Sequence, residues 1–428
     1  MSTDKRFSDD VLISLDGPLG ASNDAVVGPV SDFATDFDHT DERWIENPYP
    51  IWEALRAECP IAHTDRYGGA WLPTRHEDVS AIAYDTDRFT SRSVLMSNNR
   101  PPLDMAPAGI APPISSDPPF HHEARRVLLP AFSPRAVEKL EASTIEFCDS
   151  LLDALEGREL VDAAAEYAQH IPVRVIANML GFPQSDADLH RQFVHDLLES
   201  VNDPIEERFE KVQGLFMYLW AQIQDHIAEP QEDLTTYLIN AEMHGEPLTP
   251  IHIAGTMALL LLAGIDTTWS AIGASIWHLA THSEDREHLA NQPEAIPTAM
   301  EEFLRAYAPV TMARLVKEDM EWQGCPMKAE DWVLVSFPAA NRDPELFENP
   351  NEVSIDREVN RHSAFGLGVH RCIGSNLARM ELRVALERWL LRYPSFQLEA
   401  GREVRWSGGQ VRGPRELPIQ ILRNPVPV

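Results

Sequence analysis

The most specific segment of this sequence spans residues 363–374 and reads SAFGLGVHRCIG. Its glycines permit a tight loop that a flat ligand can approach closely. Cys372 lies just before a helix predicted over 374–392, where the helix dipole and the N–H groups of the loop favour a thiolate. Such a thiolate is suited to be the axial ligand of a haem iron, with Phe365 shielding the sulfur. A lone cysteine would more often be a buried core residue, but the complete spacing F-x-x-G-x-H-x-C-x-G favours a ligand.

The composition argues against several classes of protein. The 428 residues include 67 Asp plus Glu against 36 Lys plus Arg, which gives a formal net charge of −31. An acidic chain of this kind is poorly suited to bind nucleic acid or anionic lipid. The four cysteines, Cys59, Cys148, Cys325 and Cys372, form no CxxC pair. We therefore expect a reducing compartment and neither a disulfide framework nor a zinc or iron–sulfur site.

The sequence also suggests where the protein resides. The N-terminus lacks the basic and apolar regions of a secretory signal. The longest apolar stretch, at 253–265, has 13 residues, fewer than the roughly 20 that span a bilayer. We therefore expect a cytoplasmic protein with no membrane segment.

Most of the chain follows helical periodicity. Residues 1–45 are rich in Asp, Gly and Ser and are predicted to form a loosely ordered arm, whereas 46–428 contain no flexible linker and are predicted to form one domain. Seven prolines within 93–119 exclude a regular helix there, so this long loop is expected to be functional. Helices are predicted at 47–59, 120–131, 134–156, 160–180, 187–202, 204–228, 249–282, 295–307 and 374–392, and short strands at 70–74 and 332–337. The predicted fold class is mainly α with a minor β region (α+β).

A second motif, AGIDTT at 263–268, lies within the long apolar helix predicted at 249–282. A hydroxyl in mid-helix can bond the carbonyl one turn earlier and loosen the ladder, and Gly264 leaves room beside it. Asp266 and Thr267 are adjacent in apolar surroundings, which is costly unless both groups are satisfied or used. A kinked helix with a satisfied polar pair is the alternative to a functional pair.

Two charged pairs also follow helical spacing. Glu302 and Arg305 lie at i and i+3, a spacing that ordinarily forms a surface ion pair worth little. His121 and Arg125 lie at i and i+4 within DPPFHHEARR at 117–126, and together they could present cations to a carboxylate. Either residue alone would ordinarily be solvated.

In their order along the chain, these four segments resemble the motifs of the cytochrome P450 family, and the resemblance covers about residues 45–420. It implies a single domain with a long central helix over a haem b group and the cysteine loop beneath it. It also implies a monooxygenase that activates O₂ with two externally supplied electrons and hydroxylates, or oxidatively dealkylates, a small to medium hydrophobic substrate. A peroxygenase and a haem-thiolate sensor or carrier are the alternatives, and the intact acid–alcohol pair argues against both.

The resemblance assigns catalytic and structural roles residue by residue. Cys372 would ligate the haem iron, and Asp266 and Thr267 would support O₂ activation and proton delivery. A structural network around the haem pocket would comprise Glu302, Arg305 and Arg357.

The resemblance also assigns residues to the cofactor and the substrate. Phe120 replaces an acid that is usual in the family, so His122 remains an alternative to His121 as a propionate partner. The full cofactor set is His121, Arg125, Ala263, Gly264, Arg314, Phe365, Gly366, His370, Cys372 and Gly374, of which His121, Arg125, Arg314 and His370 would meet the propionates. Substrate would meet Met96, Leu103, Met105 and Ile110 in the proline-rich loop, the 185–205 region, Leu259, Ala263, Val310, Thr311, Gln410 and Val411. Each apolar residue of this set could equally belong to the core.

Electrons must come from another protein, because the sequence has no flavin, nicotinamide or iron–sulfur motif. The resemblance implies a bacterial protein served by a small ferredoxin, or less often a flavodoxin, and its NAD(P)H-dependent reductase. Residues 361–428 carry 11 Arg against 5 Glu, unlike the acidic remainder. Arg126, Arg371 and Arg379 are therefore predicted to form a basic docking patch; pairing with neighbouring glutamates is the alternative.

Overall fold

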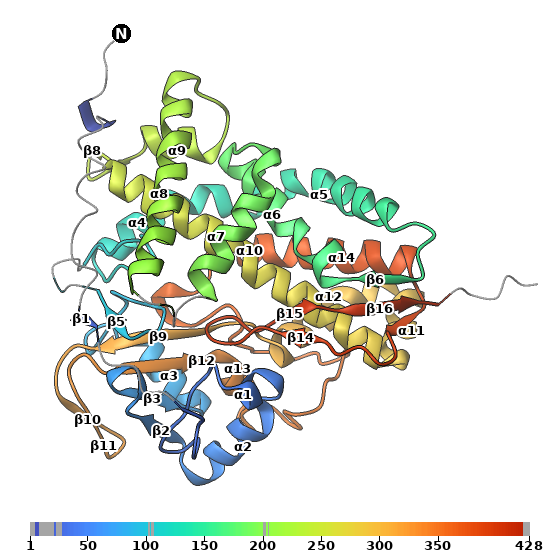
Figure 1. The fold of residues 1–428 in the computed structure, drawn as a ribbon, viewed down its shortest axis with the longest axis horizontal. Coiled ribbons are helices and arrows are strands. Elements are labelled where there is room, and N and C mark those ends of the chain that lie inside the picture. The colour runs from blue at the N-terminus through green and yellow to red at the C-terminus, as the bar shows by residue number, and fades with distance from the viewer. Residues whose placement is uncertain are drawn as a thin grey trace, which may run out of the picture.

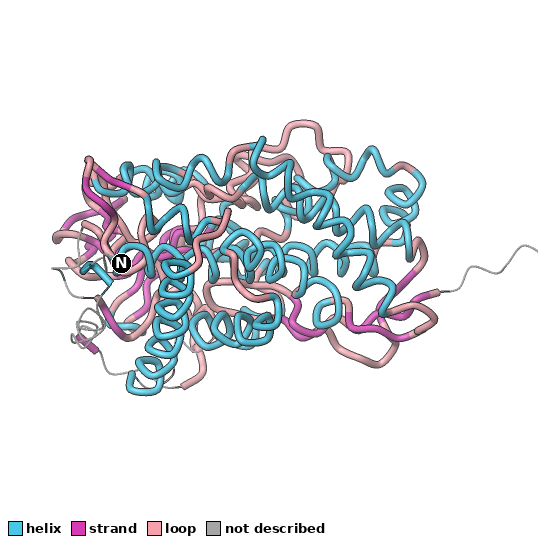
Figure 2. Tube along the Cα trace, turned by 90° about the horizontal axis from the view of Figure 1, so that it is seen from above, coloured by secondary structure: helices cyan, strands magenta, loops and turns pink. Residues whose placement is uncertain are grey.

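The computed structural model describes residues 5–7, 21–22, 28–101, 103, 107–199, 203 and 205–422. Helices fill most of the body, and the strands lie at its edges (Figures 1 and 2). About 53% of the structure is helical, which confirms the prediction of a mainly α fold with a minor β region.

The central element is helix α10 (Pro250–Thr281). It begins where the Thr249 side chain accepts a hydrogen bond from the His252 N–H and Pro250 takes the first helical position. By length and composition α10 could cross a membrane, but 67% of its most apolar window is buried inside the protein, as in a core helix. It packs against α6 (His170–Leu180), α7 (Ala187–Leu198), α8 (Ile205–Ala228), α12 (Ile296–Ala306) and α14 (Ser375–Arg392), and α14 packs in turn against α5 (Pro134–Ala154).

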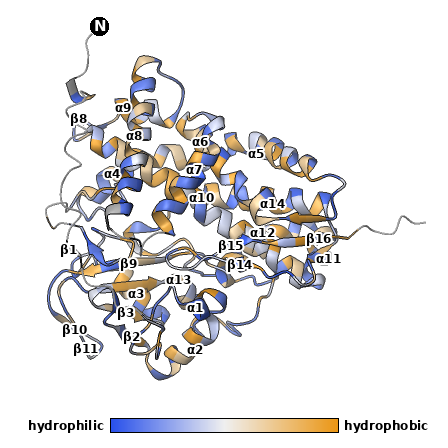
Figure 3. Ribbon diagram, in the orientation of Figure 1, coloured by the Kyte–Doolittle hydropathy of each residue, from blue (hydrophilic) through white to orange (hydrophobic). Residues whose placement is uncertain are grey.

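A five-stranded sheet lies beside this helical body, in the order β2 (Ile61–Thr64), β3 (Ala70–Pro73), β12 (Trp332–Ser336), β9 (Thr311–Val316) and β4 (Phe89–Thr90). β12 runs parallel to β3, with Trp332 opposite Ala70, and antiparallel to β9. Trp332 and Leu334 pack into one core cluster and Val333 and Val335 into another, so both faces of β12 are covered. Figure 3 shows hydrophobic residues along α10 and in this sheet.

The remaining elements are short. A three-stranded sheet has the order β13 (Phe396–Leu398), β16 (Pro418–Ile421) and β6 (Leu160–Asp162), and β14 (Arg405–Trp406) pairs with β15 (Pro414–Glu416) beside α10. The other helices are α1 (Glu42–Glu46), α2 (Tyr49–Glu58), α3 (His76–Tyr84), α4 (Phe120–Leu128), α9 (Leu234–Asn240), α11 (Ser283–Asn291) and α13 (Phe337–Ala340). The other strands are β1 (Ala21–Ser22), β5 (Asn99–Arg100), β7 (Glu242–Met243), β8 (Glu246–Pro247), β10 (Met320–Trp322) and β11 (Cys325–Met327).

The helix predicted at 160–180 is wrong in its first half. Leu160–Asp162 forms β6, in which Val161 pairs with Ile419, and a π-helical turn at Ala164–Ala168 precedes α6. The Asp162 carboxylate accepts hydrogen bonds from the N–H groups of Ala164 and Ala165, so it starts a helical turn where a helix interior was expected. The other predicted helices end within four residues of the observed bounds, whereas α1, α3, α9, α11 and α13 were not predicted.

The chain is packed well before residue 45, where the predicted arm ends. Phe37 is fully buried, and Trp44 packs with it in the cluster on one face of the sheet. Arg66 Nε donates to Asp36 Oδ1 at 2.7 Å. Phe7, near the start of the predicted arm, also packs into the main core cluster, and residues 1–4, 8–20 and 23–27 lie outside the described residues.

Candidate active site

A cavity of about 1440 Å³, part of it open to solvent, lies between α4, α10, α14 and the segment 363–374, named here the cysteine loop. Apolar side chains form most of its wall, among them Ile114, Phe132, Ile176, Leu259, Ala263, Val310, Met312 and Leu377. Its polar lining consists of Thr267, Thr268, Cys372, Glu381 and the four basic residues His121, Arg125, Arg314 and His370.

The cysteine loop needs glycine for its path. Gly366 and Gly368 have φ values of +72° and +69°, and a Cβ on Gly368 would collide with the backbone oxygen of Ala83. The Cys372 N–H donates to the Phe365 carbonyl at 2.7 Å, which closes the loop directly before α14. Backbone conformation and a neighbouring helix therefore fix where the sulfur lies.

Cys372 faces the cavity, whereas Cys148 is buried in the core and Cys59 and Cys325 are half-buried elsewhere. Burial raises the pKa of the Cys372 thiol, and the Gly374 N–H, Arg125, Arg371 and Arg379 oppose this rise. The thiolate-favouring groups expected from the sequence are thus present, but burial outweighs them. A metal that binds here would have to displace the thiol proton.

Four basic side chains, two arginines and two histidines, converge at one side of the cavity. The ring of His121 lies 4.3 Å from the ring of His370, and neither nitrogen of the buried His121 has a hydrogen-bond partner. Burial lowers the pKa of His121 to about 4 and that of Arg314 to about 10. The Asp117 carboxylate, which opposes both shifts, already accepts hydrogen bonds from Thr90 and Ser91. Buried donors left unpaired in this way fit a ligand that brings its own carboxylates.

His121, rather than its neighbour, is the histidine that faces the cavity. His122 is exposed and does not line it. The two are adjacent on α4, so their side chains point about 100° apart around the helix. One turn later Arg125 lines the cavity too, and its Nη2 donates to the Arg371 carbonyl at 2.6 Å.

The middle of α10 brings a hydroxyl to the cavity. Thr267 Oγ1 donates to the Ala263 carbonyl at 2.8 Å, the interaction one turn back that the sequence predicts. A Cβ on Gly264 would overlap the Ile176 side chain, so the missing side chain lets α6 approach α10 closely.

Asp266 points away from this cavity. It is 1% exposed, and its Oδ1 lies 2.7 Å from Arg415 Nη2. Burial raises the pKa of Asp266 to about 6, and Arg415 opposes the rise. Arg415, on β15, also donates to Glu199 Oε1 at 2.6 Å and to Ser270 Oγ at 3.2 Å. The two residues of the predicted acid–alcohol pair therefore lie on different faces of α10.

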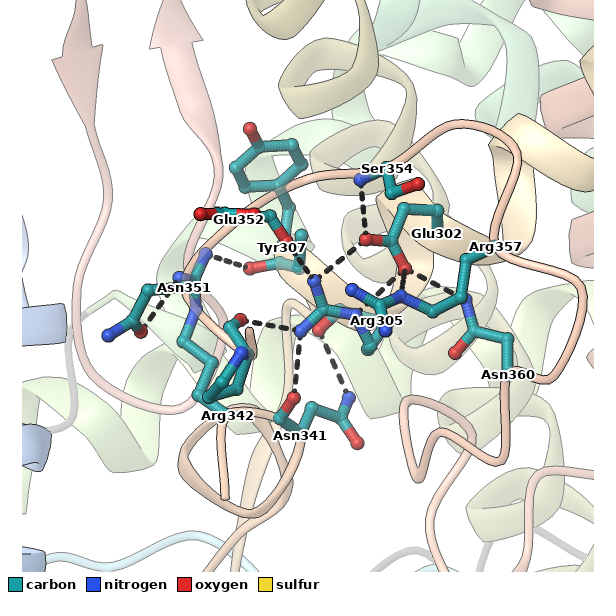
Figure 4. A network of polar contacts seen from close by, with 12 residues as sticks. Glu302, Arg305, Tyr307, Asn341, Arg342, Asn351, Glu352, Ser354, Arg357 and Asn360 are labelled. Carbon is teal, nitrogen blue, oxygen red and sulfur yellow. Dashed lines mark hydrogen bonds and ion pairs between the residues drawn. The ribbon is translucent and has the colours of Figure 1, made fainter. Parts of the chain in front are cut away.

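A second buried network lies behind the cysteine loop (Figure 4). Arg305 and Glu302 are both fully buried and form two hydrogen bonds of 2.8 Å with each other. Arg357 Nε donates to Glu302 Oε2 at 3.0 Å, which places all three predicted members together. Burial raises the pKa of Glu302, but these donors bring it below its ordinary value. The remaining partners are the carbonyls of Asn341, Pro350 and Glu352, which accept from Arg305, and the Ser354 N–H and Asn360 amide, which donate to Glu302.

A family profile described as Cytochrome P450 matches residues 158–405, more than half of the chain. The chain belongs to the cytochrome P450 family. Members of this family bind haem b through a cysteine thiolate and act as monooxygenases, so the protein is an oxidoreductase of that class.

Curated relatives align over most of both chains. The polyketide biosynthesis cytochrome P450 PksS of Bacillus subtilis is 31% identical, with 88% of this chain and 96% of PksS covered. The vitamin D(3) 25-hydroxylase of Pseudonocardia autotrophica is 33% identical, with 88% and 94% covered. The solved structure of PksS superposes with a TM-score of 0.82 at 30% identity, covering 90% of this chain and 100% of PksS.

The cavity of this cytochrome P450 fits haem b. Cys372 offers a sulfur on one wall, α10 forms the opposite wall, and His121, Arg125, Arg314 and His370 lie at one side. The unpaired ring of His121 is the clearest sign, because a propionate of haem would accept the hydrogen bond that its N–H leaves unmade.

Only part of the predicted substrate set lines the cavity. Leu259, Ala263 and Val310 do, whereas Met96, Thr311, Gln410 and Val411 are buried outside it. Leu103 is 69% exposed, and Met105 lies outside the described residues.

Gln410 instead joins three segments. The Thr311 N–H donates to its backbone oxygen at 2.9 Å. With its amide oriented to satisfy its neighbours, the side chain donates to the Thr311 carbonyl at 2.7 Å and accepts from the Met96 N–H at 3.0 Å. A long-range junction of this kind cannot be recognised from sequence spacing, and these residues were assigned to the substrate only by their position in the family.

Two buried titratable residues of this P450 were not predicted from the sequence. Glu381 on α14 lines the cavity, is 1% exposed, and its Oε2 has no hydrogen-bond partner. Burial alone raises the pKa of Glu381 to about 8, so the group is neutral at pH 7. The signal was available, because Glu381 interrupts the apolar pair Met380 and Leu382. Arg415, the partner of Asp266, does not interrupt an apolar pattern, so the sequence did not indicate that it is buried.

The three arginines predicted to form a docking patch differ from one another. Arg126 pairs with Glu123 at 2.7 Å, and Arg379 pairs with Glu301 at 2.6 Å. Arg371 is exposed and forms no ion pair with any described residue. For two of the three, pairing with a neighbouring glutamate, the alternative that the sequence left open, describes the structure.

Proposed function

We propose that this cytochrome P450 holds haem b through Cys372 and inserts one oxygen atom of O₂ into a small to medium hydrophobic substrate. The observation that carries the proposal is the cavity: one thiol, one hydroxyl from α10, two arginines and two histidines at one side and a largely apolar wall. When bound, haem supplies the redox-active iron at which O₂ is reduced with two electrons. Hydroxylation and oxidative dealkylation both fit this reaction.

Residues of the chain ligate the iron, orient the haem and bind the substrate. Cys372 binds the iron, while His121, Arg125, Arg314 and His370 orient the group by pairing with its carboxylates. The apolar wall excludes water and binds the substrate through hydrophobic contact. Phe365 carries the carbonyl that accepts from the Cys372 N–H, which steadies the sulfur.

Proton delivery falls to the middle of α10. Thr267 Oγ1 presents its oxygen to the cavity while its proton is held by the Ala263 carbonyl. Asp266 has a pKa of about 6, close to neutral pH, which suits a group that takes up and releases protons. Because Arg415 holds Asp266 away from the cavity, delivery requires this ion pair to loosen.

The partners and the location follow from the relatives and the charge distribution. We propose a cytoplasmic bacterial protein, folded as one domain over 46–428, that receives electrons from a ferredoxin or flavodoxin and its NAD(P)H-dependent reductase. Arg371, exposed beside Cys372 and without an ion pair in the described structure, is the centre of the proposed docking surface. Arg126 and Arg379, which pair with Glu123 and Glu301, contribute less free charge to it.

Two experiments test this function. The reduced protein under carbon monoxide should show the red-shifted Soret band of a thiolate-ligated haem, and Cys372→Ala should abolish that band; its persistence would exclude Cys372 as the ligand. A screen of hydrophobic compounds for the low-to-high-spin shift of the haem should then identify substrates.

A further variant addresses oxygen activation. Thr267→Ala should increase several-fold the fraction of electrons lost as hydrogen peroxide. Thr281→Ala is the matched control, because Thr281 makes the same bond one turn back to Trp277 on the same helix but is exposed and outside the cavity. Equal coupling in both variants would remove Thr267 from the mechanism.

A further inference from the structure

A charged cluster on the outer side of the cysteine loop has no place in the function above. Arg379 on α14 forms a bidentate pair with Glu301 on α12, with Nε to Oε1 at 2.6 Å and Nη2 to Oε2 at 2.9 Å. Glu301 Oε2 also lies 3.0 Å from His362 Nε2, and the His362 side chain is 3% exposed. Arg379 on α14 and His362, which directly precedes the cysteine loop, therefore meet at the carboxylate of Glu301 on α12.

The guanidinium of Arg379 also lies over an aromatic ring. Its Cζ is 4.4 Å from the centroid of Phe365, a distance at which a cation is attracted to the ring face. Phe365 lines the cavity, and its carbonyl accepts from the Cys372 N–H. Through this one residue, Arg379 contacts the part of the loop that carries the sulfur.

The same contacts make Arg379 a poor docking residue. Its charge is balanced at short range by Glu301, and its side chain is 30% exposed. The Arg379 and His362 hydrogen bonds hold the pKa of Glu301 at about 2 against the opposing effect of burial, so the carboxylate stays charged at neutral pH. A fixed cation and a fixed anion thus lie next to the cysteine loop.

We propose that Arg379 is a positioning residue that holds Phe365 against the cysteine loop and, balanced by Glu301, sets the electrostatic potential at the Cys372 sulfur and hence the reduction potential of the bound haem. This inference rests on Cys372 being the iron ligand. Reduction adds negative charge to the iron–thiolate unit, so a nearby cation favours the reduced form and a nearby anion disfavours it.

The two partners should therefore act in opposite directions. Arg379→Met removes the cation and leaves Glu301, so the midpoint potential should fall. Glu301→Gln removes the anion and leaves the cation, so the potential should rise. We expect each change to shift the ferric–ferrous equilibrium roughly threefold, or about 30 mV at about 59 mV per tenfold for one electron. Arg379→Lys keeps the charge without the bidentate pair and should give an intermediate value.

Arg388→Met provides a matched control. Arg388 lies on the same helix, has the same 30% side-chain exposure and forms a bidentate pair with Asp149 at 2.6 and 2.8 Å, but Asp149 belongs to α5 and not to the cysteine loop. Its removal should leave the potential unchanged.

The experiment is a spectroelectrochemical titration of the holoenzyme without substrate, with the Soret band of the reduced carbon monoxide complex recorded for each variant. Shifts of opposite sign for Arg379→Met and Glu301→Gln, with none for Arg388→Met, support the proposal. Shifts of the same sign, or an equal shift in the control, overturn it, because general loosening would then explain them.

Two further outcomes remain decisive. If Arg379→Met does not retain haem, the signs for Arg379→Lys and Glu301→Gln decide the question. If the thiolate band persists in all variants and no potential moves, this inference fails while the assignment of Cys372 stands. A wild-type protein without that band would instead overturn the proposed function itself.

Discussion

The molecule buries two clusters of charged side chains that differ in how well they are satisfied. In the cluster around Glu302 and Arg305, the acid faces the base and both groups have further partners. In the cluster around His121 and Arg314, basic side chains face one another, and both His121 nitrogens lack a partner. A closed network needs nothing from outside, whereas an open one is costly until a ligand completes it. The contrast separates residues that hold the fold from residues that hold a cofactor.

The largest effect should come from opening the closed network. Arg305→Met leaves the fully buried Glu302 without its main partner, which costs roughly 3–5 kcal/mol for a buried pair. We expect loss of most folded holoprotein, measured as haem content and as the free energy of unfolding in urea. Arg405→Met, which breaks an exposed pair with Glu416, should cost less than about 1 kcal/mol. If Arg305→Met lowered the free energy of unfolding as little as Arg405→Met does, the proposed difference between the two clusters would be wrong.

Removing a charge from the open cluster around His121 and Arg314 should change haem affinity more than it changes the stability of the fold. Arg314→Met replaces a buried cation that forms no ion pair with a described carboxylate, so the haem-free protein should keep or slightly gain stability. Haem affinity should fall about tenfold, or about 1.4 kcal/mol. Haem titration and urea unfolding of the haem-free protein measure the two quantities.

A buried arginine outside the cavity sharpens this test. Arg286 is 6% exposed and donates to the Leu279 carbonyl. The Arg286→Met variant should therefore be less stable than the wild type but bind haem with the same affinity. If Arg314→Met destabilised the haem-free protein as strongly, the cationic cluster would be structural as well.

Asp266 lies between these extremes, because it is paired but has a raised pKa. Its folded pKa of about 6 exceeds the ordinary value of 3.8, so the folded state binds the proton more tightly. Relative to Asp266→Asn, the wild type should gain stability as the pH falls from about 6 to about 4, by up to about 1.4 kcal/mol per pH unit. Unfolding curves over this range would contradict the assignment if the difference between the two proteins stayed constant.

The smallest effect is expected at Glu381. At pH 4, below the ordinary Glu pKa of 4.5, this acid is mostly neutral in both the folded and the unfolded state, so Glu381→Gln exchanges one neutral group for another and should change stability by less than about 0.5 kcal/mol there. As the pH rises from about 4.5 to the folded pKa of about 8, the wild type should lose stability and the variant should not. Parallel curves up to pH 9 would show that Glu381 is already ionised.

The sequence predicted what depends on local spacing. Neighbouring residues determine the geometry of three features, which could therefore be predicted: the cysteine loop, the hydrogen bond from Thr267 to the carbonyl one turn back, and the contact of the pair at i and i+3. The partner of Asp266 lies far along the chain on β15, and β6 exists because it pairs with β16, so neither is visible in a local pattern. Glu302 and Arg305 were recognised as structural through family resemblance, since their spacing alone is that of a surface pair.

The close approach of Gly368 to Ala83 has a consequence for how the protein matures. The sulfur belongs to the last quarter of the chain, while Ala83, His121 and Arg125 belong to the first third, so the two ends must meet before the site is complete. During synthesis the early residues leave the ribosome long before Cys372 is made. Haem capture should therefore be a late event, and a fragment limited to residues 158–405 would contain the cysteine without half of its cationic cluster.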